Sequence, residues 1–435
     1  MTAAADAGAR LPLGINQQVR LRGIHQALAG GAASWSTFSH LIRVGFDIAG
    51  HLDPVALAAA VEAVTRRHDA FRTAFLADEV AQIVDDQAVV GLTVVDAAEA
   101  EPARSEFEAP MDLRCAPLAR FLLVHHAADR WEFWIAVEHV VADAVAMQIV
   151  LGEISRFYAS AVSGRPAPVL PVPVQNSEVG GIEREYLASE AARRDRQFWR
   201  GMLRCEDDAV DLVFPGAGEP DPERRNRTVR HGRTLPAECV AAVDGHPGLR
   251  HLTWSTLAAA ALVQAVSRRT GNSVVPLLFP FHNRSRARLR TAVTFLARAL
   301  PLRLTTPVGG GPREVVEHTE RQILDGIQHG SFPMEKLCPG RRRPPGERPR
   351  LYLAVESTRT ALELSGCAVS GRPTGADLPV LWGIATWFNA DWPENHIVLC
   401  HPEGFLEPEE SSALADEVAA QFQLLAAAFT DRPSE

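Results

Sequence analysis

The chain has 435 residues, of which 46% are hydrophobic and 22% are charged, and its net charge is -9. This composition is typical of a folded globular protein and excludes a largely disordered chain. The length favours two large lobes over a single core. The acidic balance provides no broad basic field for nucleic acid. No run of about 18 or more apolar residues is present, so we expect no membrane span.

The six cysteines are scattered, and none forms a Cys-x-x-Cys pair. We therefore expect neither a metal site nor a disulfide framework, but reduced thiols in a cytoplasmic protein. The first residues lack the apolar run of a signal peptide. The sequence has no Gly-x-Ser-x-Gly elbow and no phosphate-cradling glycine-rich loop, so those two chemistries are not expected.

Hydrophobic periodicity predicts the first elements of the chain. Residues 38–48 alternate like a strand. Asp53, followed by a proline, is a typical helix N-cap, and the apolar residues from 57 to 64 recur at helical spacing. Residues 97–109 are predicted to form an acidic loop, and residues 118–124 another strand.

The next stretch is a strand followed by a helix. His125 and His126 follow the strand 118–124, but residues 126–130 predict a polar hairpin turn, so we do not place the site there. Residues 131–137 are aromatic and β-branched, which predicts a buried strand. A helix is predicted from Asp143, its N-cap, to about residue 158. His139 therefore lies at a strand-to-helix turn, where a side chain can leave the core and face a ligand.

Residues 163–174 are rich in glycine and proline and predict an extended linker. We place the lobe boundary there, which gives an N-terminal lobe of residues 1–175 and a C-terminal lobe of residues 176–435. The C-terminal lobe is predicted to contain helices at 182–202, 253–269 and 407–429 and strands at 273–281, 351–356 and 397–400.

Residues 137–144, with the sequence VEHVVADA, resemble the His-His-x-x-x-Asp-Gly motif of the condensation domains of nonribosomal peptide synthetases, within the chloramphenicol acetyltransferase-like superfamily. Glu138 stands in place of the first His, and Ala144 in place of the Gly. His139 aligns with the second His, to which the family's catalytic role is usually assigned. Further segments resemble the family's motifs in the family's order, namely residues 16–21, 66–75, 283–284, 293–303 and 329–337.

The resemblance implies an α/β fold of two chloramphenicol acetyltransferase-like lobes in a V-shaped pseudo-dimer with a central tunnel. It implies a condensation enzyme of natural-product biosynthesis that joins an acyl or aminoacyl thioester to a small-molecule amine or hydroxyl acceptor. The thioester would arrive on the 4'-phosphopantetheine of an acyl or peptidyl carrier protein, and no metal or tightly bound cofactor is expected. We expect a free-standing monomer, although an excised domain of a larger synthetase fits the same sequence.

The chemistry assigns roles to the motif residues. A neutral imidazole suits removal of a proton from the attacking nucleophile, so His139 is the predicted general base. A backbone N–H at the helix start, which Ala144 keeps, can stabilise the tetrahedral oxyanion. The resemblance implies that Asp143 and Arg284 form a structural pair. It also makes Thr294 and Arg298 candidate substrate contacts, with Arg298 standing where the family has Asn.

Glu138 has two interpretations. In the first, Glu138 tunes or orients His139, or contacts an amine of the acceptor. In the second, which we favour, Glu138 replaces a structural His and has no chemical role. Two alternatives stay open for the whole chain. One is a non-catalytic condensation-like domain that recruits carrier proteins or tailoring enzymes, and the other is an acyltransferase that uses coenzyme A thioesters directly.

Overall fold

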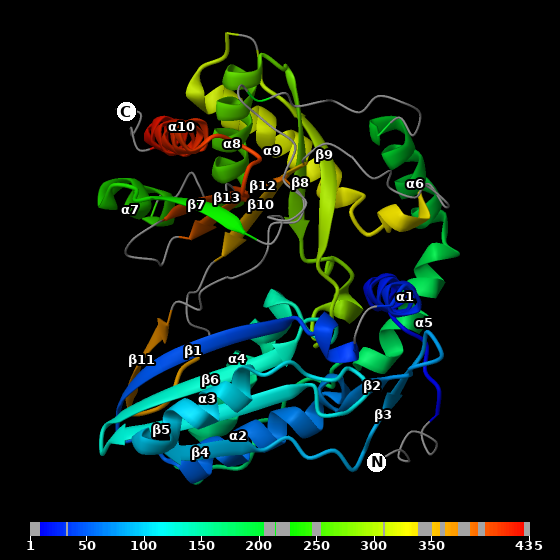
Figure 1. Cartoon of the computed structure of the whole chain (residues 1–435), viewed down its shortest axis with the longest axis vertical. Helices are drawn as coiled ribbons and strands as arrows, with labels where there is room; N and C mark the ends of the chain where they lie inside the picture. The colour runs from blue at the N-terminus through cyan, green and yellow to red at the C-terminus, as the bar shows by residue number, and fades with distance from the viewer. Residues whose placement is uncertain are drawn as a thin grey trace. The chain divides into compact units, whose positions relative to one another are not determined.

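The computed structural model describes residues 9–31, 34–203, 214, 227–245, 254–307, 309–337, 350–356, 362–372, 383–389 and 396–429. The chain divides into two compact units that both combine helices with a sheet (Figure 1). The first unit comprises Met1–Ser189, His282–Ala297 and Arg359–Gly375, and the second comprises Glu190–Phe281, Arg298–Thr358 and Ala376–Glu435.

A five-stranded sheet in the order β11-β1-β6-β5-β4 forms the frame of the first unit. Its strands are β1 (Leu41–Gly50), β4 (Leu92–Asp96), β5 (Ala119–Ala127), β6 (Arg130–Glu138) and β11 (Cys367–Arg372). β4 and β5 are parallel, and the other neighbours are antiparallel. A separate antiparallel pair joins β2 (Thr73–Phe75) to β3 (Gln82–Val84).

The helices of the first unit are α1 (Ile15–Ala29), α2 (Pro54–Arg67), α3 (Ala100–Glu108), α4 (Ala144–Val162) and α5 (Asn176–Leu187). Short 3-10 turns lie at Trp35–Phe38, Asp69–Arg72, Ala97–Glu99 and Ala287–Leu289.

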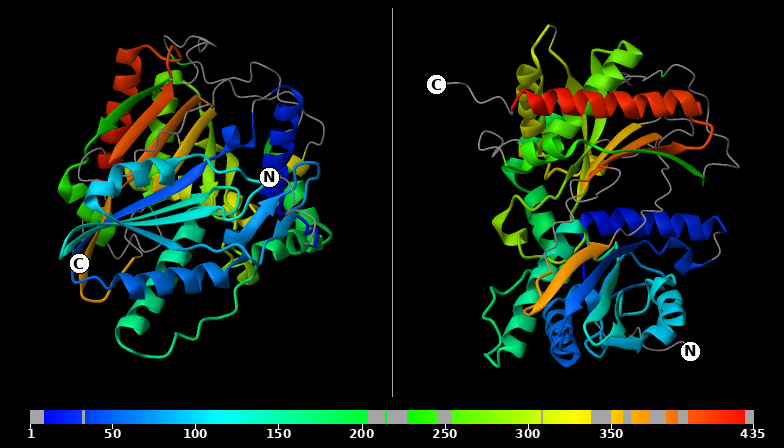
Figure 2. Two further views of the ribbon diagram at one scale, coloured as in Figure 1. Left: turned by 60° about the horizontal axis from the view of Figure 1, so that its bottom comes forward. Right: turned by 90° about the vertical axis from the view of Figure 1, so that its left-hand side faces the viewer.

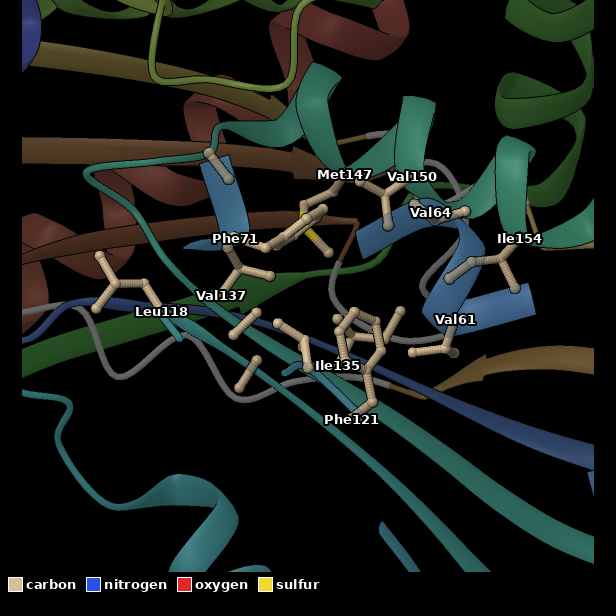
Figure 3. Packing of buried hydrophobic residues seen from close by; sticks show 14 of the residues in the cluster. Val61, Val64, Phe71, Leu118, Phe121, Ile135, Val137, Met147, Val150 and Ile154 are labelled. Carbon is tan, nitrogen blue, oxygen red and sulfur yellow. The ribbon is translucent and has the colours of Figure 1, made fainter. Parts of the chain in front are cut away.

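The core of the first unit lies between the sheet and the pair α2 and α4. Val61 and Val64 of α2 meet Val150 of α4 over the strand residues Phe121 and Ile135 (Figure 3). Each of these side chains is almost fully buried, and such burial stabilises the fold by about 1.5–3 kcal/mol per large apolar side chain. This packing fixes the end of β6 and the start of α4, between which His139 lies.

The second unit has a six-stranded sheet in the order β7-β13-β12-β10-β8-β9. Its strands are β7 (Thr228–Arg233), β8 (Val274–Phe281), β9 (Arg298–Thr305), β10 (Arg350–Glu356), β12 (Gly383–Asn389) and β13 (Ile397–Pro402). β10 is parallel to both of its neighbours, and the other pairs are antiparallel.

The helices of the second unit are α6 (Glu190–Leu203), α7 (Ala237–Gly245), α8 (Trp254–Thr270), α9 (Pro312–Gln328) and α10 (Pro408–Ala427), with a 3-10 turn at Met334–Lys336. α8, α9 and α10 pack against the sheet and against one another (Figure 2). α8 is the most deeply buried of the three, and its alanines allow this close approach.

Several elements agree with the sequence predictions. The strand at 131–137 is β6, and the helix from Asp143 is α4, with Asp143 as its N-cap. Two predictions were wrong. Residues 97–109 are mostly helical, since α3 covers Ala100–Glu108; only Ala100 and Phe107 of this helix are buried, which left little periodicity to detect. The single helix at 182–202 is two helices, α5 and α6, separated at residues 188–189.

The division into units differs from a boundary near residue 175. α5 belongs to the first unit because the backbone N–H of Asn176 donates to the Asp69 carboxylate at 2.7 Å. The segment 367–372 returns to the first unit because β11 pairs with β1. These contacts connect parts of the chain that are far apart in sequence, which a linker's composition does not reveal. In the part of the chain that is described, no helix is both long and apolar enough to span a bilayer.

Candidate functional site

The strand-to-helix turn holds the candidate general base. β6 ends at Glu138, which pairs with Leu41 in the ladder, and the N–H of His139 donates to the carbonyl of His40 at 2.8 Å. The next three residues, 140–142, are fully buried and anchor the turn. His139 itself is only partly buried, unlike the three residues that follow it.

The imidazole of His139 is held in one orientation. Its Nδ1 lies 2.9 Å from the carbonyl oxygen of Ala142, and only a protonated Nδ1 can donate to that acceptor. The neutral ring therefore carries its lone pair on Nε2, a tautomer assigned from this bond. No described residue makes a hydrogen bond to Nε2. The His40 and Phe295 rings contact the imidazole at centroid distances of 5.0 Å and 4.5 Å.

Burial lowers the pKa of His139, because the charged imidazolium loses hydration. The Arg20 guanidinium lowers this pKa further, whereas the Asp143 carboxylate and the bond to the Ala142 carbonyl oppose the shift. The pKa of His40 is lowered from 6.5 to about 4 by burial, His139 and Arg20. Both rings are therefore neutral near pH 7, which is the state that a general base requires.

Asp143 ties three segments of the first unit together. Its Oδ1 accepts the N–H of Ala146 at 2.9 Å and caps α4. Its Oδ2 accepts Nη1 of Arg284 and the N–H groups of Leu296 and Ala297, each at 2.9 Å. Asp143 and Arg284 are almost fully buried, and the structure brings them together in the way that the predicted structural pair requires.

The carboxylate of Glu138 is directed toward the start of β1. It accepts hydrogen bonds from the Ser39 hydroxyl and from the N–H of His40, the latter at 3.1 Å to Oε1. Burial raises the pKa of this fully buried carboxyl group, while these two donors and Arg20 oppose the shift. No described contact joins the carboxylate to the His139 ring, so the geometry favours a structural interpretation of Glu138.

Thr294 belongs to a buried polar network. Its hydroxyl donates to Oδ1 of Asn176 at 2.6 Å, and Nε2 of Gln17 donates to the same oxygen at 2.9 Å. Nδ2 of Asn176 donates to Gln82 at 2.8 Å and to Thr73 at 3.1 Å. Thr294 is 1% exposed, so its hydroxyl is already satisfied inside the unit. These contacts favour a structural role for Thr294, and its expected substrate contact stays a prediction.

Ala144 and Arg298 occupy different units. Ala144 is the first residue of α4 and is exposed, and no described residue accepts its backbone N–H. That N–H is free to donate at the positive end of the helix dipole. Arg298 begins β9 in the second unit, where its Nη1 donates to the carbonyl of Ser331 at 2.8 Å. It is half-buried there, and its expected substrate contact stays a prediction.

Three residues of the site were missed from the sequence. Phe295 lies in a segment that resembles the family, yet nothing in the pattern indicated that its ring contacts His139. His40 immediately precedes β1, and its proximity to His139 depends on the pairing of β1 with β6. Asn176 gave no signal, because the four partners of its side chain come from distant parts of the chain.

A surface hollow of about 480 Å³ lies elsewhere on the first unit and contains none of the predicted site residues. Its lining comes from β1, β5, β6 and β11: Asp47, Ile48, Ala49, His126, Arg130, Trp131, Glu132, Ala368, Val369 and Ser370. Nε2 of His126 lies 3.1 Å from a carboxylate oxygen of Glu132 in this hollow. In the described residues, no group of three or more potential metal ligands comes together.

The two mixed α/β units, one of which carries an imidazole at a strand-to-helix turn, agree with the two-lobed α/β fold that the resemblance implies. The chain belongs to the condensation domain family, whose sequence profile matches residues 32–345. Tyrocidine synthase 2 of Brevibacillus parabrevis is 26% identical over 353 residues, which cover 79% of this chain. The chain spans only 9% of the length of that relative.

Solved structures show the same fold. The condensation domain of the monacolin K polyketide synthase MokA superposes with a TM-score of 0.77 at 18% identity, covering 96% of this chain and 98% of that one. The X-domain from teicoplanin biosynthesis, solved in complex with OxyB, superposes with a TM-score of 0.69 at 23% identity, covering 98% of this chain and 94% of that one. The predicted family and the two-lobed α/β fold are thus confirmed.

Proposed function

We propose that this chain is a condensation enzyme that joins an acyl or aminoacyl thioester, carried on the phosphopantetheine of a carrier protein, to an amine or hydroxyl acceptor. The observation that supports this proposal most is the orientation of His139. Its Nδ1–H donates to the Ala142 carbonyl, so Nε2 has the lone pair that a general base needs. Membership of the condensation domain family supports the same chemistry.

In the proposed reaction, Nε2 of His139 takes the proton of the acceptor as its nitrogen or oxygen attacks the thioester carbonyl carbon. The carbonyl oxygen becomes an oxyanion, which the exposed N–H of Ala144 can stabilise. Collapse of this intermediate breaks the carbon–sulfur bond. The departing thiolate then takes the proton back from the imidazolium of His139. The result is an amide or ester and a free phosphopantetheine thiol, and His139 is neutral again.

A non-catalytic recruitment module is the alternative with a specific observation behind it. One relative in fold is the X-domain that was solved in complex with OxyB. The motif of this chain also departs from the family pattern at Glu138 and Ala144. A domain of this kind would bind a carrier protein or a tailoring enzyme without turning over a thioester.

One experiment separates these functions. The purified protein is incubated with octanoyl and aminoacyl groups, each loaded on a carrier protein or on coenzyme A, together with amino acid and alcohol acceptors. Amide or ester formation, followed by mass spectrometry, supports the condensation enzyme, and a preference for coenzyme A supports the direct acyltransferase. Carrier or tailoring-enzyme binding by calorimetric titration, without product from any pair, supports the recruitment module.

A further inference from the structure

A second imidazole lies beside the proposed base. The rings of His40 and His139 have centroids 5.0 Å apart and are tilted by 48°. His40 is half-buried. None of the described residues makes a hydrogen bond to the His40 ring. The ring therefore acts on His139 by packing against it and by lowering the local dielectric constant, and not through a hydrogen bond. Phe295 contacts the same imidazole at a centroid distance of 4.5 Å, so two rings pack against His139.

Glu138 holds the backbone that carries this second ring. Its carboxylate accepts the N–H of His40 and the Ser39 hydroxyl, and the carbonyl of His40 accepts the N–H of His139. Each of the two segments, 39–40 and 138–139, thus both donates hydrogen bonds to the other and accepts them from it. Because the carboxylate is fully buried, retaining it costs hydration energy, and these donors offset that cost.

We propose that His40 is a positioning residue of this site and that Glu138 acts through it. The glutamate fixes residues 39–40 so that the His40 ring packs against His139, excludes water from it and keeps it neutral and oriented. This inference rests on the proposed function only for its effect on rate. The contact between the two rings is a property of the folded first unit and can be tested without any substrate.

The charged groups around the two rings come from three elements. Arg20 of α1 acts on both rings, Glu138 of β6 contacts the backbone of His40, and Asp143 at the start of α4 acts on His139. Asp143 is paired with Arg284. Replacing His40 leaves all four of these charges in place. A change in the titration of His139 would then report the lost packing and the entry of water.

The test is a nuclear magnetic resonance pH titration of histidine-labelled protein, with the His139 signal assigned from its loss in His139→Gln. In the wild type, His139 should titrate below 6.5. His40→Ala should shift that midpoint upward, because water reaches the ring, whereas His40→Phe should leave it low, because an aromatic ring still covers it. His125→Ala, which removes a histidine stacked on Trp131 in the same unit, is the matched control and should have no effect.

Glu138 is tested in the same way. Glu138→Gln keeps an acceptor for the N–H of His40 and should move the His139 midpoint little, whereas Glu138→Ala should reproduce His40→Ala. Circular dichroism verifies that each variant is folded, and His40→Asn replaces His40→Ala if the latter unfolds. A His139 midpoint unchanged in folded His40→Ala, or shifted equally in His40→Phe, would overturn the positioning role. An unchanged midpoint in Glu138→Ala would overturn the role of Glu138.

Activity gives an independent second readout. If the chain catalyses condensation, the acidic limb of the kcat/KM profile should move upward in His40→Ala together with the His139 midpoint. A limb that stays in place while the midpoint moves would contradict the link between His40 and rate. If no thioester is turned over, the proposed function fails, and the titration alone still decides whether His40 acts on His139.

Discussion

Nη1 of Arg284 lies 2.9 Å from Oδ2 of Asp143, and the two side chains are 3% and 1% exposed. The same oxygen accepts two backbone N–H groups from residues 296 and 297. This one carboxylate therefore holds the start of α4, the segment after β8 and the segment that carries Phe295. We therefore expect Asp143 to contribute to the assembly of the site.

Replacing Asp143 with Ala should destabilise the protein by about 3–5 kcal/mol, since the buried Arg284 and two N–H groups lose their acceptor. Urea unfolding followed by tryptophan fluorescence measures the change. Arg288→Gln is the matched control, because Arg288 and Glu185 form an exposed pair at 3.4 Å that should contribute about 0–1 kcal/mol. If both variants lost the same free energy of unfolding, the buried pair would contribute no more to stability than the exposed pair does.

The assignment of Thr294 to the buried network can be tested directly. Thr294→Val removes one hydrogen bond to Asn176 and should cost about 1 kcal/mol, while Asn176→Ala disrupts four and should cost about 2–4 kcal/mol. KM for the thioester should stay the same in Thr294→Val. A KM that rises without a loss of stability would restore the substrate contact that the sequence suggested.

The sequence predicted those parts of the site that depend on neighbours in the chain. The strand before His139, the helix after it and the Asp143 cap all follow from local spacing. The pair Asp143 and Arg284 came only from the resemblance to a family, because 141 positions separate the two residues.

Contacts between residues that are distant in the chain could not be predicted from the sequence. His40 meets His139 through strand pairing, Asn176 meets Gln17 and Thr294 through a buried network, and β11 returns to β1 from the far end of the chain. None of these leaves a periodic pattern. α3 was missed for a related reason, because a mostly exposed acidic helix shows almost no apolar face.

Acid should destabilise the second unit through His401. This residue is 0% exposed, its Nδ1 donates to the Pro402 carbonyl at 2.8 Å, and its Nε2 makes no hydrogen bond to a described residue. Burial lowers the pKa of His401 below 6.5. The folded state thus binds fewer protons than the unfolded state, so its stability is complete above about pH 6.5 and falls as the pH drops below that value.

Thermal unfolding at pH 7.5 and pH 5.0 measures this effect. His401→Gln keeps a donor for the Pro402 carbonyl but does not titrate, so its Tm should fall less between the two pH values than that of the wild type. His125→Gln, at a site that is partly open to solvent, should behave like the wild type. A wild-type Tm that is as high at pH 5.0 as at pH 7.5 would contradict the prediction.

The central claim is that Nε2 of His139 accepts the proton of the attacking group, and a single-turnover assay tests it most directly. The rate of amide or ester formation from a carrier-bound thioester is measured for the wild type and for His139→Gln, with circular dichroism to verify the fold. We predict a loss of about 10²–10⁴-fold in the variant, the contribution expected of a positioned general base. A folded His139→Gln protein that forms product at the wild-type rate would contradict the account.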